Sequence, residues 1–150
     1  MMKSKLLLAL LACTLMAGCD RVDPNSPLGK RQALFKDMLH TSENLGGMLR
    51  GRLTFNEKDF AEGAAHLDEI SRQPWQHFPQ AREDSDHSQA RDDVWQRQER
   101  FQQLAKELEA ATAELHSAAQ ASPLQPQALG APVAKVEAAC KACHEEFRIY

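Results

Sequence analysis

Two cysteines and a histidine near the C-terminus have a spacing that fits one specific kind of chemistry. Cys140 and Cys143 are three residues apart and His144 follows directly, so the segment reads C-x-x-C-H. On a helix, side chains three residues apart share a face, with Cβ atoms about 5–6 Å apart. Both thiols can then add to the two vinyl groups along one haem edge, and the adjacent imidazole can ligate the iron. The motif predicts one covalent haem c, attached through Cys140 and Cys143 with His144 as axial ligand.

Three other interpretations of these residues compete with haem attachment. A structural disulfide or a redox dithiol would use the same cysteine pair, but redox dithiols usually lie in a βαβ unit, which this chain lacks. A zinc site needs a fourth ligand, and no second Cys or His pair has a suitable spacing. The third interpretation is chance recurrence of a five-residue motif. An export signal, which c-type maturation requires, favours haem over all three.

The first eighteen residues are predicted to be a signal peptide. Lys3 and Lys5 precede an apolar stretch that ends in small residues and is too short to span a membrane. The junction before Cys19 resembles the bacterial lipobox, which implies cleavage there and a lipid anchor on Cys19. The following Asp20 resembles the signal that keeps enteric lipoproteins on the inner membrane. We therefore expect a periplasmic, membrane-tethered protein in which residues 19–27, polar with two prolines, form the tether.

The composition favours a single all-α domain. Among the 150 residues there are 22 Ala and 18 Leu, whereas Val, Ile and Thr together total 10. Ala and Leu form helices readily, and sheets are enriched in β-branched residues. The net charge is −3 and no run of basic residues is longer than two, so nucleic-acid binding is not expected.

Heptad spacing of apolar residues predicts four helices that form an antiparallel bundle over residues 28–150. The predicted helices extend from Leu28 to about Arg50, from the N-cap Asn56 to before Pro74, from about Asp92 to Ala119, and from a first turn containing Pro132 to the C-terminus. The long irregular stretch 73–91 is expected to cover a site.

A haem motif on the last helix of an exported four-helix bundle resembles the cytochrome c′ family. The resemblance covers nearly the whole chain after the signal. It is carried by residues 31–36, by Pro74-Trp75 with Phe78, by Ala90-Arg91 with Val94-Trp95, and by Cys140 to Arg148. It implies a haem protein rather than an enzyme, with NO and CO as small gas ligands, periplasmic redox partners and a possible homodimer.

The resemblance also draws attention to the residue opposite the proximal histidine. Family members with Met there resemble low-spin electron carriers, whereas those with Leu or another apolar residue leave the iron five-coordinate and bind NO or CO. In this sequence the position falls on Phe35, which has no lone pair to donate. We expect a five-coordinate iron beneath Phe35. In the alternative, Met38, one helical turn further on, is the sixth ligand of a low-spin electron carrier.

Four polar residues are candidates for the haem edges. Arg31 lies on an otherwise apolar helix face, where an unpaired charge would be costly and a haem propionate would neutralise it. Arg148 follows His144 by one turn and resembles the family's proximal arginine; Gln32 and Arg91 are further candidates.

A peroxidase would need a distal base or cation, whereas the predicted distal face offers only Phe35 and Met38. A haem-free envelope protein is the last alternative, and the colour of the protein distinguishes it.

Overall fold

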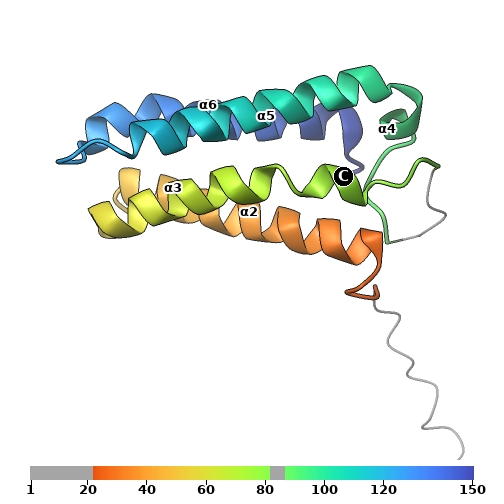
Figure 1. Cartoon of the computed structure of the whole chain (residues 1–150), viewed down its shortest axis with the longest axis horizontal. Coiled ribbons are helices and arrows are strands. Elements are labelled where there is room, and N and C mark those ends of the chain that lie inside the picture. The colour runs from red at the N-terminus through yellow and green to blue at the C-terminus, as the bar shows by residue number, and fades with distance from the viewer. Residues whose placement is uncertain (1–21, 82–86) are drawn as a thin grey trace, which may run out of the picture.

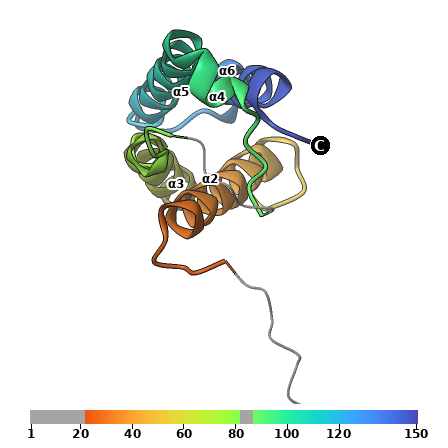
Figure 2. The same cartoon turned by 90° about the vertical axis from the view of Figure 1, so that its right-hand side faces the viewer.

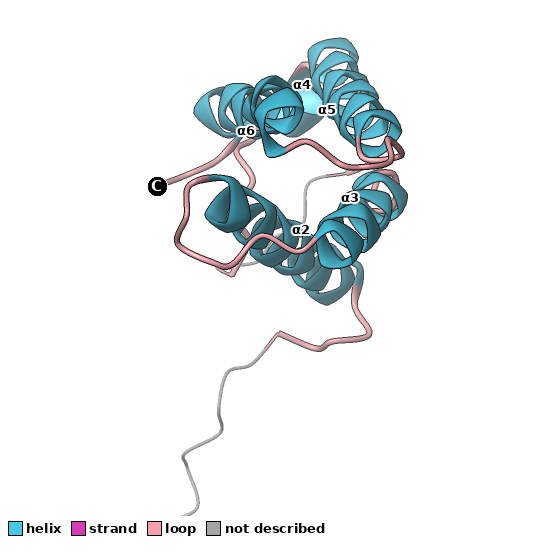
Figure 3. Ribbon diagram, turned by 90° about the vertical axis from the view of Figure 1, so that its left-hand side faces the viewer, coloured by secondary structure: helices cyan, strands magenta, loops and turns pink. Residues whose placement is uncertain are grey.

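Four long helices form an antiparallel bundle in a computed structural model that describes residues 22–81 and 87–150. They are α2 (Pro27–Leu49), α3 (Glu57–Ser71), α5 (Gln98–Ala118) and α6 (Pro126–Phe147). The α2/α3 pair packs against the α5/α6 pair (Figure 1), and the end-on views show the four helices around one axis (Figures 2 and 3). The predicted all-α four-helix bundle is confirmed. The predicted signal peptide, Cys19 and Asp20 lie outside the described residues.

Side-chain caps set the starts of the first two long helices. The Ser26 hydroxyl accepts a hydrogen bond from the Gly29 amide, so α2 begins at Pro27, one residue before the predicted boundary. The predicted cap at Asn56 is present, with its side-chain oxygen accepting from the Asp59 amide at 3.0 Å. Each cap satisfies one of the amides that the first turn of a helix leaves without an intrahelical partner.

The third and fourth helices differ from the sequence prediction. The expected helix from Asp92 to Ala119 is broken at Arg97, whose φ of −122° and ψ of 50° are not helical, into the short α4 (Asp93–Gln96) and α5. The last helix begins at Pro126, and Pro132 therefore lies inside it rather than in its first turn. Pro126 itself occupies the first turn, where a missing N–H removes no hydrogen bond. The turn between the two prolines is retained because it buries Leu129 completely.

The buried side chains form two clusters along the bundle. The larger is shared by the four long helices and includes Phe60, Leu67, Leu115 and Leu129. The smaller is composed of Val94, Phe101, Leu104 and Phe147. It lies where the short 3-10 helix η1 (Pro74–His77), α4 and the C-terminal turn of α6 meet, which we call the site end of the bundle (Figure 1). Within the residues described, no helix is long and apolar enough to cross a membrane.

Candidate functional site

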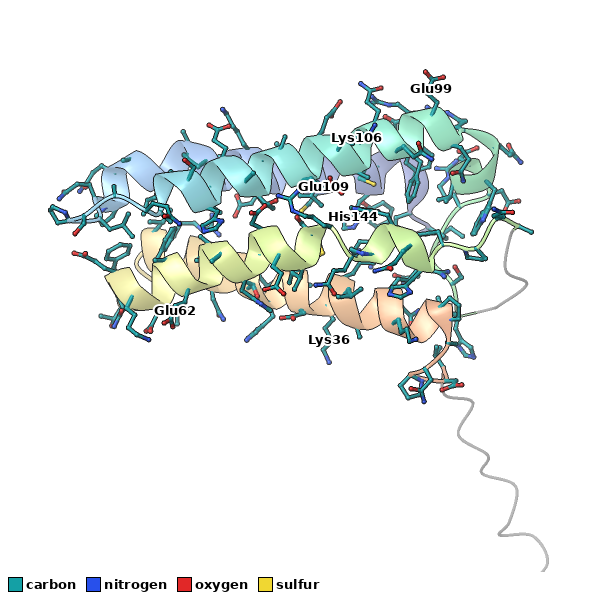
Figure 4. The ribbon with its side chains drawn as sticks, in the orientation of Figure 1. Lys36, Glu62, Glu99, Lys106, Glu109 and His144 are labelled. Carbon is teal, nitrogen blue, oxygen red and sulfur yellow. The ribbon has the colours of Figure 1, made fainter. Side chains whose placement is uncertain are left out.

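The C-x-x-C-H motif lies on the C-terminal half of α6, between the two clusters. Cys140 packs against the larger cluster and Cys143 against the smaller one, and both are half-buried free cysteines. Figure 4 shows His144 between the α5/α6 pair and the α2/α3 pair. One face of α6 therefore carries all three side chains of the motif toward the inside of the bundle.

Burial keeps the three motif side chains uncharged. It raises the pKa of Cys143 to about 11, with a smaller contribution from the neighbouring Cys140, and it also raises the pKa of Cys140. Burial, aided by the positive charge of Arg148, lowers the pKa of His144. At neutral pH the thiols are protonated and the imidazole is neutral. A neutral imidazole has a free nitrogen lone pair, which is the form that ligates iron.

A carboxylate fixes the motif helix to its neighbours. Glu146 on α6 accepts from Arg97 Nη2 at 2.7 Å, and from Arg100 Nε and Nη2 at 3.0 and 2.6 Å. The hydrogen bonds from Arg100, followed by those from Arg97, lower the pKa of Glu146. Arg97 is the residue at which α4 and α5 separate, so this triad joins the helix break to α6. The pairing holds the C-terminal turn of α6 in register with the start of α5.

Five aromatic rings from different elements meet at the site end. Phe35 of α2 is 6.0 Å from Trp75 and 6.4 Å from Phe78, measured between ring centroids. Phe101 of α5 lies 5.9 Å from Trp75, 4.9 Å from Phe78 and 5.3 Å from Phe147. All are edge-to-face contacts, an arrangement that aromatic pairs favour. A cavity of about 380 Å³ opens beside them, lined by Trp75, Phe78, Phe101 and Ala105, with a glutamine rim.

One buried polar atom at this end lacks a hydrogen-bond acceptor. The indole Nε1 of Trp75 has no partner among the described residues, although buried N–H groups are nearly always satisfied. A haem has carboxylates on its edge, which can accept a hydrogen bond from the indole N–H of Trp75. Its flat apolar ring can pack against the aromatic side chains of the site end. The two thiols and the imidazole of the C-x-x-C-H motif on α6 also fit a haem. Nowhere in residues 22–81 and 87–150 do three His, Cys, Asp or Glu side chains gather as a metal ion alone would require.

Arg31 is buried at the same end, with 3% of its surface exposed. Its Nη1 donates to the His77 carbonyl at 3.0 Å and its Nη2 to the Ser88 hydroxyl at 3.3 Å. Its guanidinium carbon lies 4.6 Å from the centroid of the Phe78 ring. The Arg31 guanidinium, predicted to lie on an apolar helix face, is thus stabilised by hydrogen bonds and by the face of the Phe78 ring. Its contact with a propionate stays a prediction.

The segment 87–91 joins α2 to the end of α6. Gln32 donates from Nε2 to the His87 carbonyl at 3.0 Å. The amide of Arg91 donates to the Phe147 carbonyl at 2.9 Å. The Arg91 side chain is half-exposed, and its Nε lies 3.6 Å from Asp93 Oδ2. In the structure, therefore, Gln32 contacts this segment, and Arg91 joins the segment to Phe147 and Asp93.

The two distal candidates occupy different surroundings. Phe35 is half-buried against Trp75 and Phe78 at the site end. Met38 is almost fully buried as a member of the larger cluster. Sequence reasoning did not single out Phe101, Phe147 or Gln89 as neighbours of the site, because their contacts join segments far apart in the chain. The length of the irregular stretch 73–91, which supplies η1 and segment 87–91, was a signal for Gln89 but not for Phe101 or Phe147, which lie on α5 and α6.

Comparison with known proteins places this arrangement in a family. The family model described as Cytochrome C' matches residues 26–148, most of the chain. The chain belongs to the cytochrome c′ family. A cytochrome c' from Rhodopseudomonas palustris (strain ATCC BAA-98 / CGA009) is 26% identical over 121 residues, which cover 81% of this chain and 80% of that protein. Proteins of this family bind one covalent haem c and are periplasmic, gas-binding or electron-carrying proteins rather than classical enzymes.

Solved cytochrome c′ structures have the same fold. The crystal structure of cytochrome c' from Rubrivivax gelatinosus matches with a TM-score of 0.74 and 26% identity, covering 83% of this chain and 98% of that one. The nitric oxide complex of a mutant cytochrome c prime from Alcaligenes xylosoxidans matches with a TM-score of 0.75 and 22% identity. That match covers 84% of this chain and 98% of the other. The four-helix bundle is thus a cytochrome c′ bundle.

Proposed function

We propose that this cytochrome c′ binds NO and CO at a five-coordinate haem iron and exchanges electrons with periplasmic partners. In this proposal Cys140 and Cys143 hold the haem, His144 is the proximal ligand, and Phe35 lies over the distal face. The observation that carries it is the position of Phe35, at the site end between two aromatic rings. A phenyl ring has no atom that can ligate iron, so nothing on that ring competes with an incoming ligand.

The residues of the site have distinct roles in this proposal. Neutral His144 supplies a nitrogen lone pair, and the Glu146 clamp keeps its helix in place. Phe35 excludes water from the distal face and offers no hydrogen bond, which disfavours anions and favours uncharged ligands. Arg31 and the indole N–H of Trp75 are donors for the propionates. When bound, the haem supplies an iron that cycles between ferric and ferrous and takes up a diatomic gas.

The optical spectrum of the ferrous protein, recorded before and after CO, tests this function. The protein is expressed with c-type maturation so that haem is attached. We expect a high-spin spectrum whose Soret band sharpens and shifts when CO is added, because the sixth position is open. A low-spin spectrum with split α and β bands, unmoved by CO, would contradict the proposal. It would favour the electron carrier in which Met38 is the sixth ligand.

We also propose that the protein is tethered to a bacterial membrane through a lipid on Cys19. The support is the sequence itself: a predicted signal over residues 1–18, the lipobox-like junction, and the predicted polar tether 19–27, whose last residue begins α2. Asp20 favours the inner membrane. In cells labelled with radioactive palmitate, we expect the protein to carry label and to fractionate with membranes. Cys19→Ala should lose the label, and label that persists in this variant would contradict the proposal.

A further inference from the structure

Backbone pairing places Gln89 next to Arg148. Ala90 and Arg148 form an isolated antiparallel bridge, and the Ile149 amide donates to the Gln89 carbonyl at 2.8 Å. These bonds fix the register of segment 87–91 against the residues that follow α6. In such a pairing, the two backbones are close enough for side chains at neighbouring positions on the two segments to contact each other. The Gln89 and Arg148 side chains are therefore brought together by the main chain.

The two side chains are joined by two hydrogen bonds. Gln89 Oε1 accepts from Arg148 Nε at 3.2 Å and from its Nη2 at 2.9 Å. On another side, the guanidinium carbon lies 5.7 Å from the centroid of the Tyr150 ring. An arginine side chain has many rotamers, and two hydrogen bonds from one edge of its planar fork select few of them. Gln89 thus determines where the Arg148 charge resides.

The location of this charge matters because it acts on His144. Arg148 follows His144 by one turn, and its amide donates to the His144 carbonyl at 3.1 Å. Side chains four residues apart on a helix are neighbours on one face, so the Arg148 and His144 side chains start from the same face of the last turn. The effect of one charge on another falls with distance and with exposure to water. A guanidinium released from Gln89 would spend more of its time in solvent, further from the imidazole.

We propose that Gln89 is a positioning residue that holds the Arg148 guanidinium beside the proximal histidine. The inference rests on the proposed function, in which His144 ligates the haem iron. A fixed cation near the iron disfavours the ferric form, which carries one more positive charge than the ferrous form. Gln89 therefore raises the reduction potential through Arg148 without contacting the haem. It also makes segment 87–91 part of the proximal face, although that segment is far from the motif in the sequence.

The variant Gln89→Ala, made in the full haem-containing protein, tests the inference with two measurements. The first is the NMR signal of the Arg148 Nε–H in a diamagnetic ferrous form, with CO bound if the iron is five-coordinate. We expect a signal protected from solvent exchange in the native protein and loss of that protection in the variant. The second measurement is the reduction potential, which we expect to fall toward the value of Arg148→Met.

Gln103→Ala is the matched control, because it makes the same change at an exposed glutamine of α5 whose side chain donates to Glu107 and has no contact with Arg148. It should leave both readouts unchanged. In an Arg148→Met background, Gln89→Ala should have no further effect on the potential. An unchanged Nε–H signal in Gln89→Ala, or a fall in potential that persists without Arg148, would overturn the inference. An unaltered spectrum in His144→Ala would instead contradict the proposed function, and the Nε–H signal would still report whether Gln89 holds Arg148.

Discussion

Replacing both Cys140 and Cys143 with serine is expected to abolish covalent haem attachment. Serine is nearly the same size as cysteine, but its hydroxyl lacks the reactivity of sulfur that addition to a vinyl group requires. After denaturing electrophoresis, the native protein should retain haem in its band and the double variant should show none. Each single variant keeps one thiol and should retain haem through one bond. The measurement is haem staining of the gel beside a stain for total protein.

Ala142→Ser provides a matched control for the cysteine variants. It introduces the same hydroxyl on the same turn of α6, at a half-buried position between the two cysteines. The C-x-x-C-H pattern is unchanged, so this variant should keep its covalent haem. Haem that stays with the denatured double variant would show that another residue makes the attachment. Loss of haem in Ala142→Ser as well would show that α6 tolerates no added hydroxyl there, and would remove the support for a specific role of the thiols.

Phe35→Met is expected to turn the protein from a gas binder into a six-coordinate cytochrome. A thioether has the lone pair that the phenyl ring lacks, and methionine with histidine is an established pair of axial haem ligands. If the introduced thioether occupied the sixth position about 99% of the time, the apparent affinity for CO would fall about a hundredfold. The ferrous spectrum should become low-spin before any CO is added. A CO titration followed at the Soret band measures both effects.

Two variants separate this prediction from its alternatives. Phe35→Leu also places an apolar group at the distal position and should remain high-spin with nearly native CO affinity. Met38→Leu removes the thioether one turn away, which is buried in the larger cluster, and should leave the spectrum unchanged. A native protein that is low-spin, and becomes high-spin only in Met38→Leu, would show that Met38 is the ligand.

The bundle was predictable because its core positions follow the helical repeat. Phe101, Leu108 and Leu115 are seven residues apart, and all three are buried as the heptad pattern predicts. The motif was readable for a similar reason, since its three residues are within five positions on one helix. The break at Arg97 was not predictable, because the polar residues around it permit a helix. At the break, Arg97 pairs with Glu146, which is 49 residues away in the chain.

The rest of the site is assembled from contacts that have no local signature. Arg31 meets Ser88 across 57 residues, and Arg148 meets Gln89 across 59. A glutamine or serine in a polar loop is compatible with many surroundings, so nothing in its neighbours along the chain indicates a partner. Phe35 was singled out only through its match to a family position. The rings of Trp75 and Phe78 that contact it come from a 3-10 helix and its end within a stretch predicted only as a loop.

The position of the cysteines on the last helix has a consequence for the order of events during maturation. The docking of α6 against α5 and α2 half-buries both thiols. Small helical bundles fold within about microseconds to milliseconds, so the thiols of a chain that is free to fold become half-buried quickly. If both thiols carry haem, they are fully accessible to the attachment machinery only while α6 is undocked, so attachment is favoured before the bundle closes.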